Sequence, residues 1–148
     1  MARIQHIAIT ARENEKVAEF YQRVFGMELV FKQPTRGGRA AYYLTDGNIN
    51  LAILPGGPNS KEGINHFGFH IDEMEKTADV ALAAGATKQP EAVPQDGRFA
   101  ETYILDPVGT RVDLSVAGWA TAPLTEAELK ERLARTQVET PPIAATTQ

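Results

Sequence analysis

The sequence predicts an α+β protein made of two βαβββ modules, followed by a short C-terminal helix and a tail. The first observation is that the order strand, helix and three strands, read from hydrophobic periodicity, occurs twice along the chain. The second is the spacing of marker residues: His6 and His66 are 60 residues apart, and so are Asp46 and Asp106. Each aspartate begins a glycine-containing turn before the last strand of its half. Repetition of one unit is therefore the simplest interpretation.

The first module spans residues 1–58. Residues 3–10 alternate between two faces and predict a strand, and residues 13–25 place apolar side chains at helical spacing before Gly26, a typical helix stop. Three more strands are predicted at residues 27–33, 39–45 and 48–54, separated by turn residues.

The second module spans residues 64–118 and follows a Pro- and Gly-rich linker. Residues 65–71 predict a strand, and residues 74–86 predict a helix that ends near Gly85. Three extended segments then follow, at residues 87–95, 100–106 and 110–116.

Residues 119–148 form an appendix to the modules. Thr125 and Glu128 fit a capping box at the start of a helix over residues 126–137. Residues 138–148 are rich in Pro and Thr and predict a disordered tail.

Composition limits the function. With 148 residues and 43% hydrophobic content, one domain is the default, and a net charge of −4 excludes a basic nucleic-acid surface. The absence of cysteine excludes disulfides, thiolate metal sites and cysteine nucleophiles. The first ten residues contain only a short apolar run, so neither a signal peptide nor a membrane span is predicted, and a cytoplasmic protein is expected.

Four strands, the first and last of each module, combine an apolar face with a face that carries a polar side chain beside small neighbours. These side chains are His6, Asn50, His66 and Asp113. If the faces converge, two imidazoles and one carboxylate form a facial triad, which suits Fe(II) and also Mn, Ni, Co or Zn. The alternative is that both histidines are satisfied by hydrogen bonds and that Asp113 lies on a solvent-facing edge.

Three segments carry a resemblance to a known family. They are "HIAIT…KVAEFYQRVFGMELV" within residues 6–30, "NHFGFHIDEMEKTADVALAAGA" at 65–86 and "YILDPVGTRVDLS" at 103–115. In these segments the chain resembles the vicinal oxygen chelate superfamily, which includes glyoxalases, bleomycin-resistance proteins and extradiol dioxygenases. The resemblance implies one domain over residues 1–118, in which paired βαβββ modules form a cupped mixed sheet around a metal. Since such cups are often completed by dimerisation, it also implies a homodimer.

The resemblance assigns the ligands position by position. The first-strand histidines of the two modules match His6 and His66, and the last-strand carboxylate of the second module, usually glutamate, matches Asp113. The equivalent place in the first module matches Asn50, where glyoxalases and epimerases generally carry Glu or Gln. A carboxamide has no useful basicity, so the chain looks more like the three-ligand dioxygenases, with Fe(II) as the favoured metal.

Further residues are expected on the substrate side. Tyr103 lies ten residues before Asp113, a spacing at which three-ligand members often place a substrate-contacting tyrosine. Glu101 shares its strand face with Tyr103, and Arg98 lies at the rim of the cavity, where Asn50 and Arg98 are expected to bind substrate.

His70 is separated from the metal site by strand geometry. At roughly 3.3 Å per residue it lies about 13 Å from His66 along the strand, too far to bind the same ion. It is expected either to line the cavity as an acid or base or to face solvent.

Three functions follow from these residues. The favoured one is a metal-dependent, dioxygenase-like enzyme that chelates a small substrate through two adjacent oxygens, such as a catecholate or enediolate. The second is a metal-dependent lyase or isomerase of glyoxalase or epimerase type, with Glu101 or His70 as base. The third is a metal-free protein that sequesters a small molecule, since such proteins share this fold.

Overall fold

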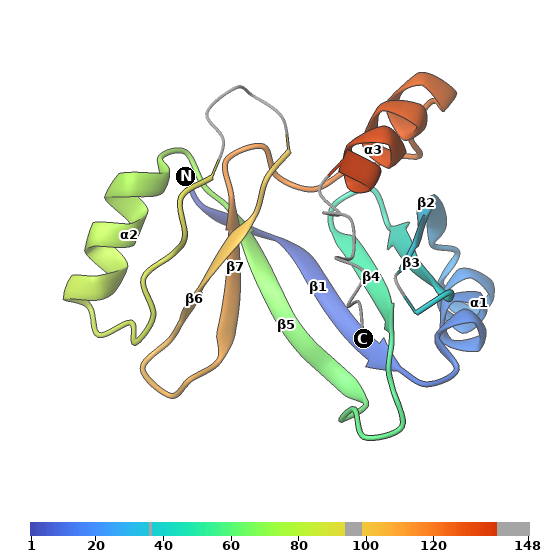
Figure 1. The fold of residues 1–148 in the computed structure, drawn as a ribbon, viewed down its shortest axis with the longest axis horizontal. Coiled ribbons are helices and arrows are strands. Elements are labelled where there is room, and N and C mark those ends of the chain that lie inside the picture. Colours follow the sequence, from blue (N-terminus) through green and yellow to red (C-terminus); the bar gives the residue numbers. More distant parts are fainter. Residues whose placement is uncertain (36, 94–98, 139–148) are drawn as a thin grey trace, which may run out of the picture.

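The computed structural model describes residues 1–35, 37–93 and 99–138, and confirms the α+β class with one mixed sheet (Figure 1). The strands are β1 (Arg3–Ala11), β2 (Glu28–Pro34), β3 (Ala40–Thr45), β4 (Asn50–Pro55), β5 (Gly63–His70), β6 (Thr102–Leu105) and β7 (Arg111–Ser115). The helices are α1 (Asn14–Phe25), α2 (Met74–Ala83) and α3 (Glu126–Val138).

The sheet order shows the repeat. The strands run β2-β3-β4-β1-β5-β7-β6, so that each module places its first strand beside its last. These inner pairs, β1 with β4 and β5 with β7, are parallel, and the modules meet through the antiparallel pair β1 and β5. The polar strand faces predicted from the sequence therefore come from four adjacent strands.

Each module has its own small core on the helix side of the sheet. In the first, α1 packs Ala18 against Leu44 and Ile53, all three of them buried. In the second, Ile71 and Leu114 are buried with Met74 of α2 against them. Figure 1 shows α1 and α2 on opposite flanks of the sheet. With apolar side chains on that side, the opposite face of the central strands is left for polar groups.

One predicted segment differs from the structure. Within residues 87–93 there is no strand, and Lys88 makes a single bridge to Leu105. The amide of Thr87 donates to the Leu105 carbonyl at 2.9 Å, but Pro90 then has no N–H to continue a ladder. Residues 94–98 lie outside the described part of the chain.

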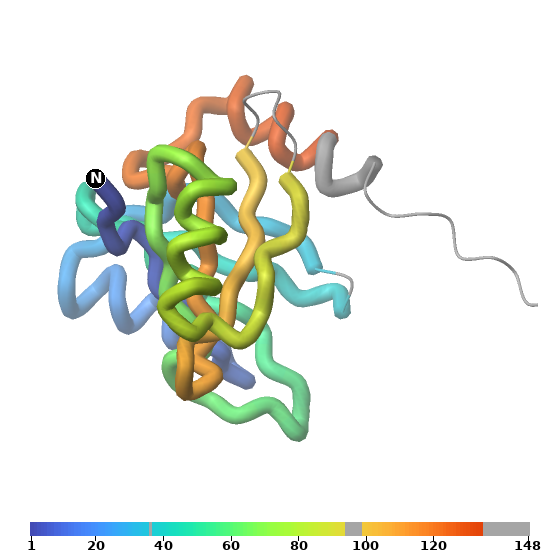
Figure 2. Tube along the Cα trace, turned by 90° about the vertical axis from the view of Figure 1, so that its left-hand side faces the viewer, coloured from blue at the N-terminus to red at the C-terminus, as the bar shows by residue number. Residues whose placement is uncertain are grey.

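The segment after β7 folds back onto the sheet. The amide of Leu124 donates to the carbonyl of Val30 at 3.2 Å, and the Arg132 guanidinium of α3 lies 4.3 Å from the centre of the Phe31 ring. Figure 2 shows this segment and α3 running across the top of the molecule. The predicted helix over 126–137 is confirmed and includes Val138, while residues 139–148 lie outside the described residues. Among the helices described, none is long and apolar enough to span a membrane.

Candidate metal centre

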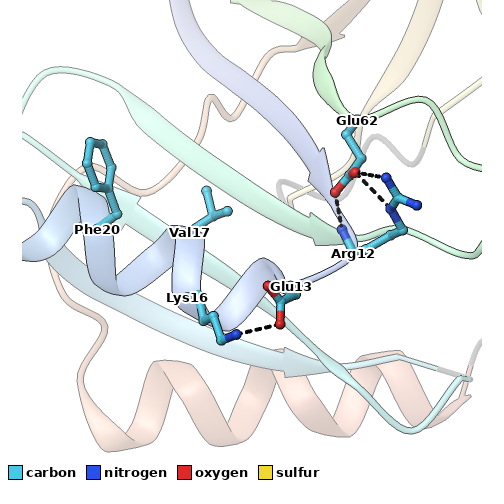
Figure 3. A pocket seen from close by; sticks show the side chains of 6 residues that line it. All are labelled: Arg12, Glu13, Lys16, Val17, Phe20 and Glu62. Atoms are coloured by element: carbon cyan, nitrogen blue, oxygen red, sulfur yellow. Dashed lines mark hydrogen bonds and ion pairs between the residues drawn. The ribbon is translucent and has the colours of Figure 1, made fainter.

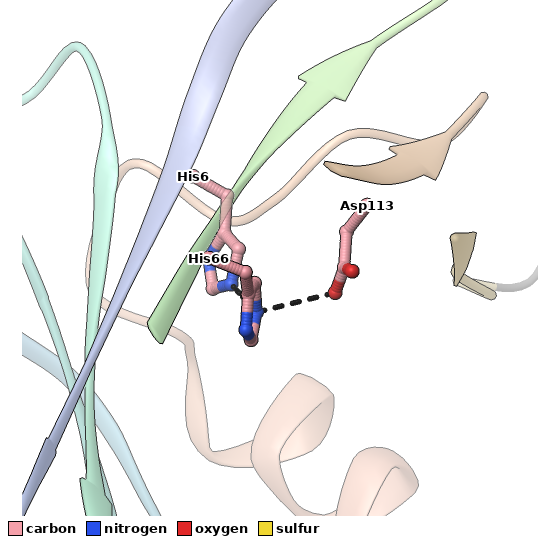
Figure 4. A group of neighbouring side chains, drawn as sticks. All are labelled: His6, His66 and Asp113. Carbon is pink, nitrogen blue, oxygen red and sulfur yellow. Dashed lines mark hydrogen bonds and ion pairs between the residues drawn. The ribbon is translucent and has the colours of Figure 1, made fainter. Parts of the chain in front are cut away.

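Three predicted ligands, His6, His66 and Asp113, come together in the structure (Figure 4). The two Nε2 atoms of His6 and His66 are 3.2 Å apart, and Nε2 of His66 is 3.2 Å from Oδ2 of Asp113. All three residues are buried, with exposed fractions of 3%, 6% and 0%. One possible ligand atom from each lies within 4.8 Å of the others.

The strand register explains this convergence. In the β1–β5 pair, His6 lies opposite Gly68 and His66 lies opposite Ala8, so each imidazole has a small neighbour on the next strand. In the β5–β7 pair, Gly68 lies opposite Asp113. Residues directly opposite one another across a sheet share a face, so all three ligands project to the same side.

The register also corrects the expected counterpart of Asp113 in the first module. Ala8 pairs with Ala52, just as Gly68 pairs with Asp113. Ala8 and Gly68 are equivalent because each lies opposite the histidine of the other module. Ala52, rather than Asn50, therefore occupies the position of the carboxylate, and the first module offers no fourth donor there. The error arose because sequence spacing does not fix the register of parallel strands that are far apart in the chain.

Arg111 is a site residue that the sequence reasoning missed. Its Nε donates to Oδ1 of Asp113 at 2.6 Å, and its Nη2 donates to Oδ2 at 3.0 Å. This bidentate bond raises the pKa of Arg111 and fixes the carboxylate. The sequence signal that could have identified Arg111 is its position two residues before Asp113, on the same strand face.

Burial keeps both histidines neutral. It lowers the pKa of His6 to about 4, with nearby His66 adding to the effect, and it also lowers the pKa of His66. Neutral imidazoles are the form that binds metal ions.

These residues fit a divalent cation. Two donors about 2.1 Å from one ion and at right angles to each other lie about 3 Å apart, which matches the two separations of 3.2 Å. An ionised carboxylate has about four lone-pair sites, so Asp113 can accept both bonds from Arg111 and still bind an ion. Two nitrogens and one carboxylate oxygen suit Fe, Mn, Co, Ni or Zn.

Trp119 covers the histidine side of the site and was also missed. Its ring stacks on His6, with centroids 4.8 Å apart and planes 6° from parallel. Its backbone N–H donates to Oε1 of Gln5 at 3.0 Å, and the side chain is buried next to Gly68. The segment after β7 thus forms part of the wall around His6, His66 and Asp113, the cup of the sheet.

Glu101 reaches the same cup. The indole N–H of Trp119 donates to Oε2 of Glu101 at 2.9 Å. Although the residue as a whole is exposed, the protein around its carboxylate desolvates it, and this, together with the charge of Asp113, raises the pKa of Glu101. The bond from Trp119 locates the carboxylate in this desolvated environment.

Tyr103 lies opposite Asp113 in the β6–β7 register. Its ring has Nζ of Lys88 4.0 Å from its centre and the guanidinium carbon of Arg111 at 4.5 Å. The expected tyrosine is therefore next to the carboxylate, held by two cations.

The remaining predicted residues differ in where they lie. Asn50 is opposite His6 in the β1–β4 register, whereas His70 is not bonded to the candidate ligands. Nε2 of His70 bonds to the Val116 carbonyl at 3.1 Å, and none of its described bonds reaches the ligands. Nδ2 of Asn50 donates to the carbonyl of Ala120 at 2.8 Å. Arg98 lies outside the described residues.

A second depression lies at the start of α1 (Figure 3). It is lined by Arg12, Glu13, Lys16, Val17, Phe20 and Glu62. Arg12 pairs there with Glu62, and Lys16 pairs with Glu13, so its charges satisfy one another.

Comparison with known families decides the membership of the chain. A model of the Glyoxalase/Bleomycin resistance protein/Dioxygenase superfamily matches residues 3–114. The chain belongs to this superfamily. The resemblance inferred from the sequence is thereby confirmed.

One known relative comes from a plant and has low sequence identity to this chain. The Arabidopsis thaliana protein called probable lactoylglutathione lyase, chloroplastic, is 22% identical over 140 residues, which cover 86% of this chain and 39% of that protein. The chain thus spans about two fifths of the length of this relative.

Solved structures of other proteins share the fold. A hypothetical protein of Bacillus halodurans C-125 matches with a TM-score of 0.60 and 17% identity, covering 77% of this chain and 93% of that one. A Streptomyces coelicolor methylmalonyl-CoA epimerase in complex with 2-nitronate-propionyl-CoA matches with a TM-score of 0.58 and 20% identity. The match covers 82% of this chain and 98% of the epimerase chain.

Proposed function

We propose that this protein is a divalent-metal-dependent lyase or isomerase that chelates a small substrate through two adjacent oxygens and moves a proton at a neighbouring carbon. The observation that carries the proposal is the buried convergence of His6, His66 and Asp113 within 4.8 Å. The similar proteins, a probable lactoylglutathione lyase and methylmalonyl-CoA epimerases, support this class of reaction.

The ligand residues would hold the cation, and the cation would stabilise negative charge on the chelated oxygens. Arg111 holds the Asp113 carboxylate in place through two hydrogen bonds, so that the ligand needs little reorganisation. Tyr103, which lies opposite Asp113 in the β6–β7 register, would donate a hydrogen bond to a substrate oxygen.

Glu101 is the residue that we assign as the base. A general base works best when its pKa lies near the working pH, and burial moves the pKa of Glu101 in that direction. The bond from Trp119 orients one carboxylate oxygen, and among the described residues no hydrogen bond uses the other, which would take the proton. Glu101 thus supplies the basic group that Asn50 could not, which favours proton transfer.

Metal binding is the first test. Calorimetric titration of the chelator-treated protein with Zn²⁺, Mn²⁺ and Ni²⁺ should show one site per chain. His66→Ala should abolish it, whereas His70→Ala, which removes a histidine outside the ligand group, should leave it intact. Equal binding by the two variants would rule out this site.

The reaction class is the second test. Metal-dependent proton transfer should persist under argon. Glu101→Gln should lower the kcat of this reaction by about 100-fold or more, because the base is lost. A variant that retains full kcat would remove Glu101 from the catalytic role.

The dioxygenase chemistry favoured by the sequence remains a prediction. If it holds, protein loaded anaerobically with Fe(II) should consume O₂ in the presence of a catechol. The absence of O₂ uptake across a catechol panel, with proton exchange intact under argon, would support the lyase or isomerase instead.

A metal-free small-molecule binder is the second candidate, and the Arg111–Asp113 pair favours it. In that pair the carboxylate already has a cationic partner. Elemental analysis of the native protein distinguishes the two, since a binder should contain no stoichiometric metal.

A further inference from the structure

Two asparagines lie next to the two candidate histidine ligands, Asn65 beside His66 and Asn50 opposite His6. We infer that Asn65 and Asn50 are positioning residues that hold the ring hydrogens of His66 and His6 on Nδ1, so that both Nε2 lone pairs face one metal ion. This inference rests on the metal-dependent function proposed above and names the residues that prepare its ligands.

Asn65 contacts the ring of His66 directly. Its Oδ1 lies 2.8 Å from Nδ1 of His66, while its Nδ2 donates to Oγ1 of Thr10 at 3.1 Å. A carboxamide oxygen accepts hydrogen bonds and cannot donate them, so the hydrogen in this bond must be on Nδ1. In a neutral imidazole, Nε2 then carries a free lone pair.

Asn50 is placed to do the same for His6. The two residues are directly opposite in the β1–β4 register, and Nδ1 of His6 and Oδ1 of Asn50 are both buried with no hydrogen-bond partner among the described residues. Nδ2 of Asn50 is held by the Ala120 carbonyl at 2.8 Å, which leaves Oδ1 as the free end. The two atoms fall short of hydrogen-bond geometry, but a donor and an acceptor buried on paired residues can satisfy each other after a small ring rotation.

The consequence concerns Nε2, the nitrogen on the other side of each imidazole ring. With both hydrogens on Nδ1, the pair of Nε2 atoms at 3.2 Å and the Asp113 oxygen at 3.2 Å present three lone pairs to one point. No hydrogen bond can form among three acceptors, whereas one cation satisfies all of them. This also accounts for Asn50 at a position that holds no ligand.

The test combines ring spectroscopy with affinity. In Zn²⁺-loaded protein, long-range ¹H–¹⁵N spectra should show His6 and His66 with hydrogen on Nδ1 and metal on Nε2, and His70 serves as the internal reference. Asn65→Leu and Asn50→Leu should each weaken Zn²⁺ binding by about 10- to 100-fold and expose the Nδ1 hydrogen to rapid exchange. Asn65→Asp and Asn50→Asp, which keep an acceptor, should restore protection of that hydrogen.

Asn14→Leu is the matched control. Asn14 is also a buried asparagine, but it bonds to the Ala40 and Ile53 carbonyls, so its loss should lower stability without changing Zn²⁺ affinity or the ring spectra. Ligation through Nδ1, or unchanged spectra and affinity in both leucine variants, would overturn the inference.

Failure of the proposed function gives a different result. If the wild-type protein binds no Zn²⁺, the metal-dependent function fails, and the metal-free spectra then decide the role of Asn65. Hydrogen on Nδ1 of His66 that is lost in Asn65→Leu would support the assignment of that residue. Hydrogen on Nε2 in the wild-type protein would overturn it.

Discussion

Small side chains at the centre of the sheet decide what can occupy the cup. Ala8, Ala52 and Gly68 lie on three of the four inner strands, where Ala8 pairs with Ala52 and Gly68 pairs with Asp113. Their lack of bulk leaves room above them. Trp119 uses that room over Gly68, where a Cβ would lie 2.6 Å from Cη2 of the indole and 3.3 Å from Cβ of Asp113. The glycine is thus needed for close approach of the indole.

Gly68→Ala should displace Trp119. Because Trp119 is the only tryptophan, its fluorescence maximum should shift to longer wavelength, and Zn²⁺ affinity should fall as Asp113 is pushed aside. Gly57→Ala is the control, since a Cβ there lies 3.7 Å from Oγ of Ser60, an ordinary contact. An unchanged emission spectrum in Gly68→Ala would contradict the close packing of Trp119 on Gly68.

The buried histidines predict a dependence of stability on pH. Folding lowers the pKa of His6 from 6.5 to about 4, so between these values the unfolded chain binds more protons than the folded one. The free energy of unfolding of the metal-free protein should therefore fall as the pH drops from about 6.5 to about 4, by about 3 kcal/mol in all.

Comparison with His6→Gln isolates this contribution. Glu101, whose pKa is raised, acts in the opposite direction by favouring the folded state at low pH, and it is present in both proteins. Urea titrations at several pH values should give a difference curve that declines only over this range. A flat difference curve would show that His6 is not buried in its neutral form.

At the scale of elements, two equivalent turns make the repeat visible. Oδ1 of Asp46 accepts the amides of Asn48 and Ile49, and Oδ1 of Asp106 accepts those of Val108 and Thr110. These bonds lower the pKa of both aspartates. Local side-chain to backbone bonds of this kind depend on short sequence stretches, which is why the turns were predictable.

The capping box of α3 is another local device. The amide of Thr125 donates to Oε2 of Glu128 at 2.8 Å, and the amide of Glu128 donates to Oγ1 of Thr125 at 3.3 Å. Thr125→Ala should destabilise α3 by about 1 kcal/mol and increase hydrogen exchange of its first-turn amides. Thr77→Ala within α2 removes a threonine that caps nothing and should not increase exchange in its own helix.

At the scale of the whole molecule, the C-terminal segment closes over the first module. Arg132 lies 4.3 Å from the centre of the Phe31 ring and 4.7 Å from that of Phe99, and burial lowers its pKa. Burial also raises the pKa of Tyr43 in the same region to about 12. The residues after position 118, expected from the sequence only as an appendix, form part of the wall of the cup.

A homodimer is the remaining prediction at this scale. It follows from the resemblance, since cups of this superfamily are often completed by a second chain. Light scattering coupled to size exclusion should give twice the chain mass of 16.1 kDa at micromolar concentration. A mass of one chain, unchanged by concentration and by Zn²⁺, would contradict it.

The fold and the grouping of the three candidate ligands were largely predictable from the sequence. Periodicity, turn chemistry and the spacing of His6, His66 and Asp113 are local or repeated features, and each can be read without knowing which strands pair. The segment at 87–93 was the exception, because Pro90 lacks the N–H that would continue a ladder beyond the Lys88–Leu105 bridge.

Only the tertiary structure decided what surrounds the ligands. The register made Ala52 the counterpart of Asp113, placed Arg111 on its carboxylate, and set Asn50 opposite His6. The return of the chain after β7 brought Trp119 onto His6. The physical reason is that contacts between residues tens of positions apart depend on strand register and chain path, which local sequence patterns do not specify.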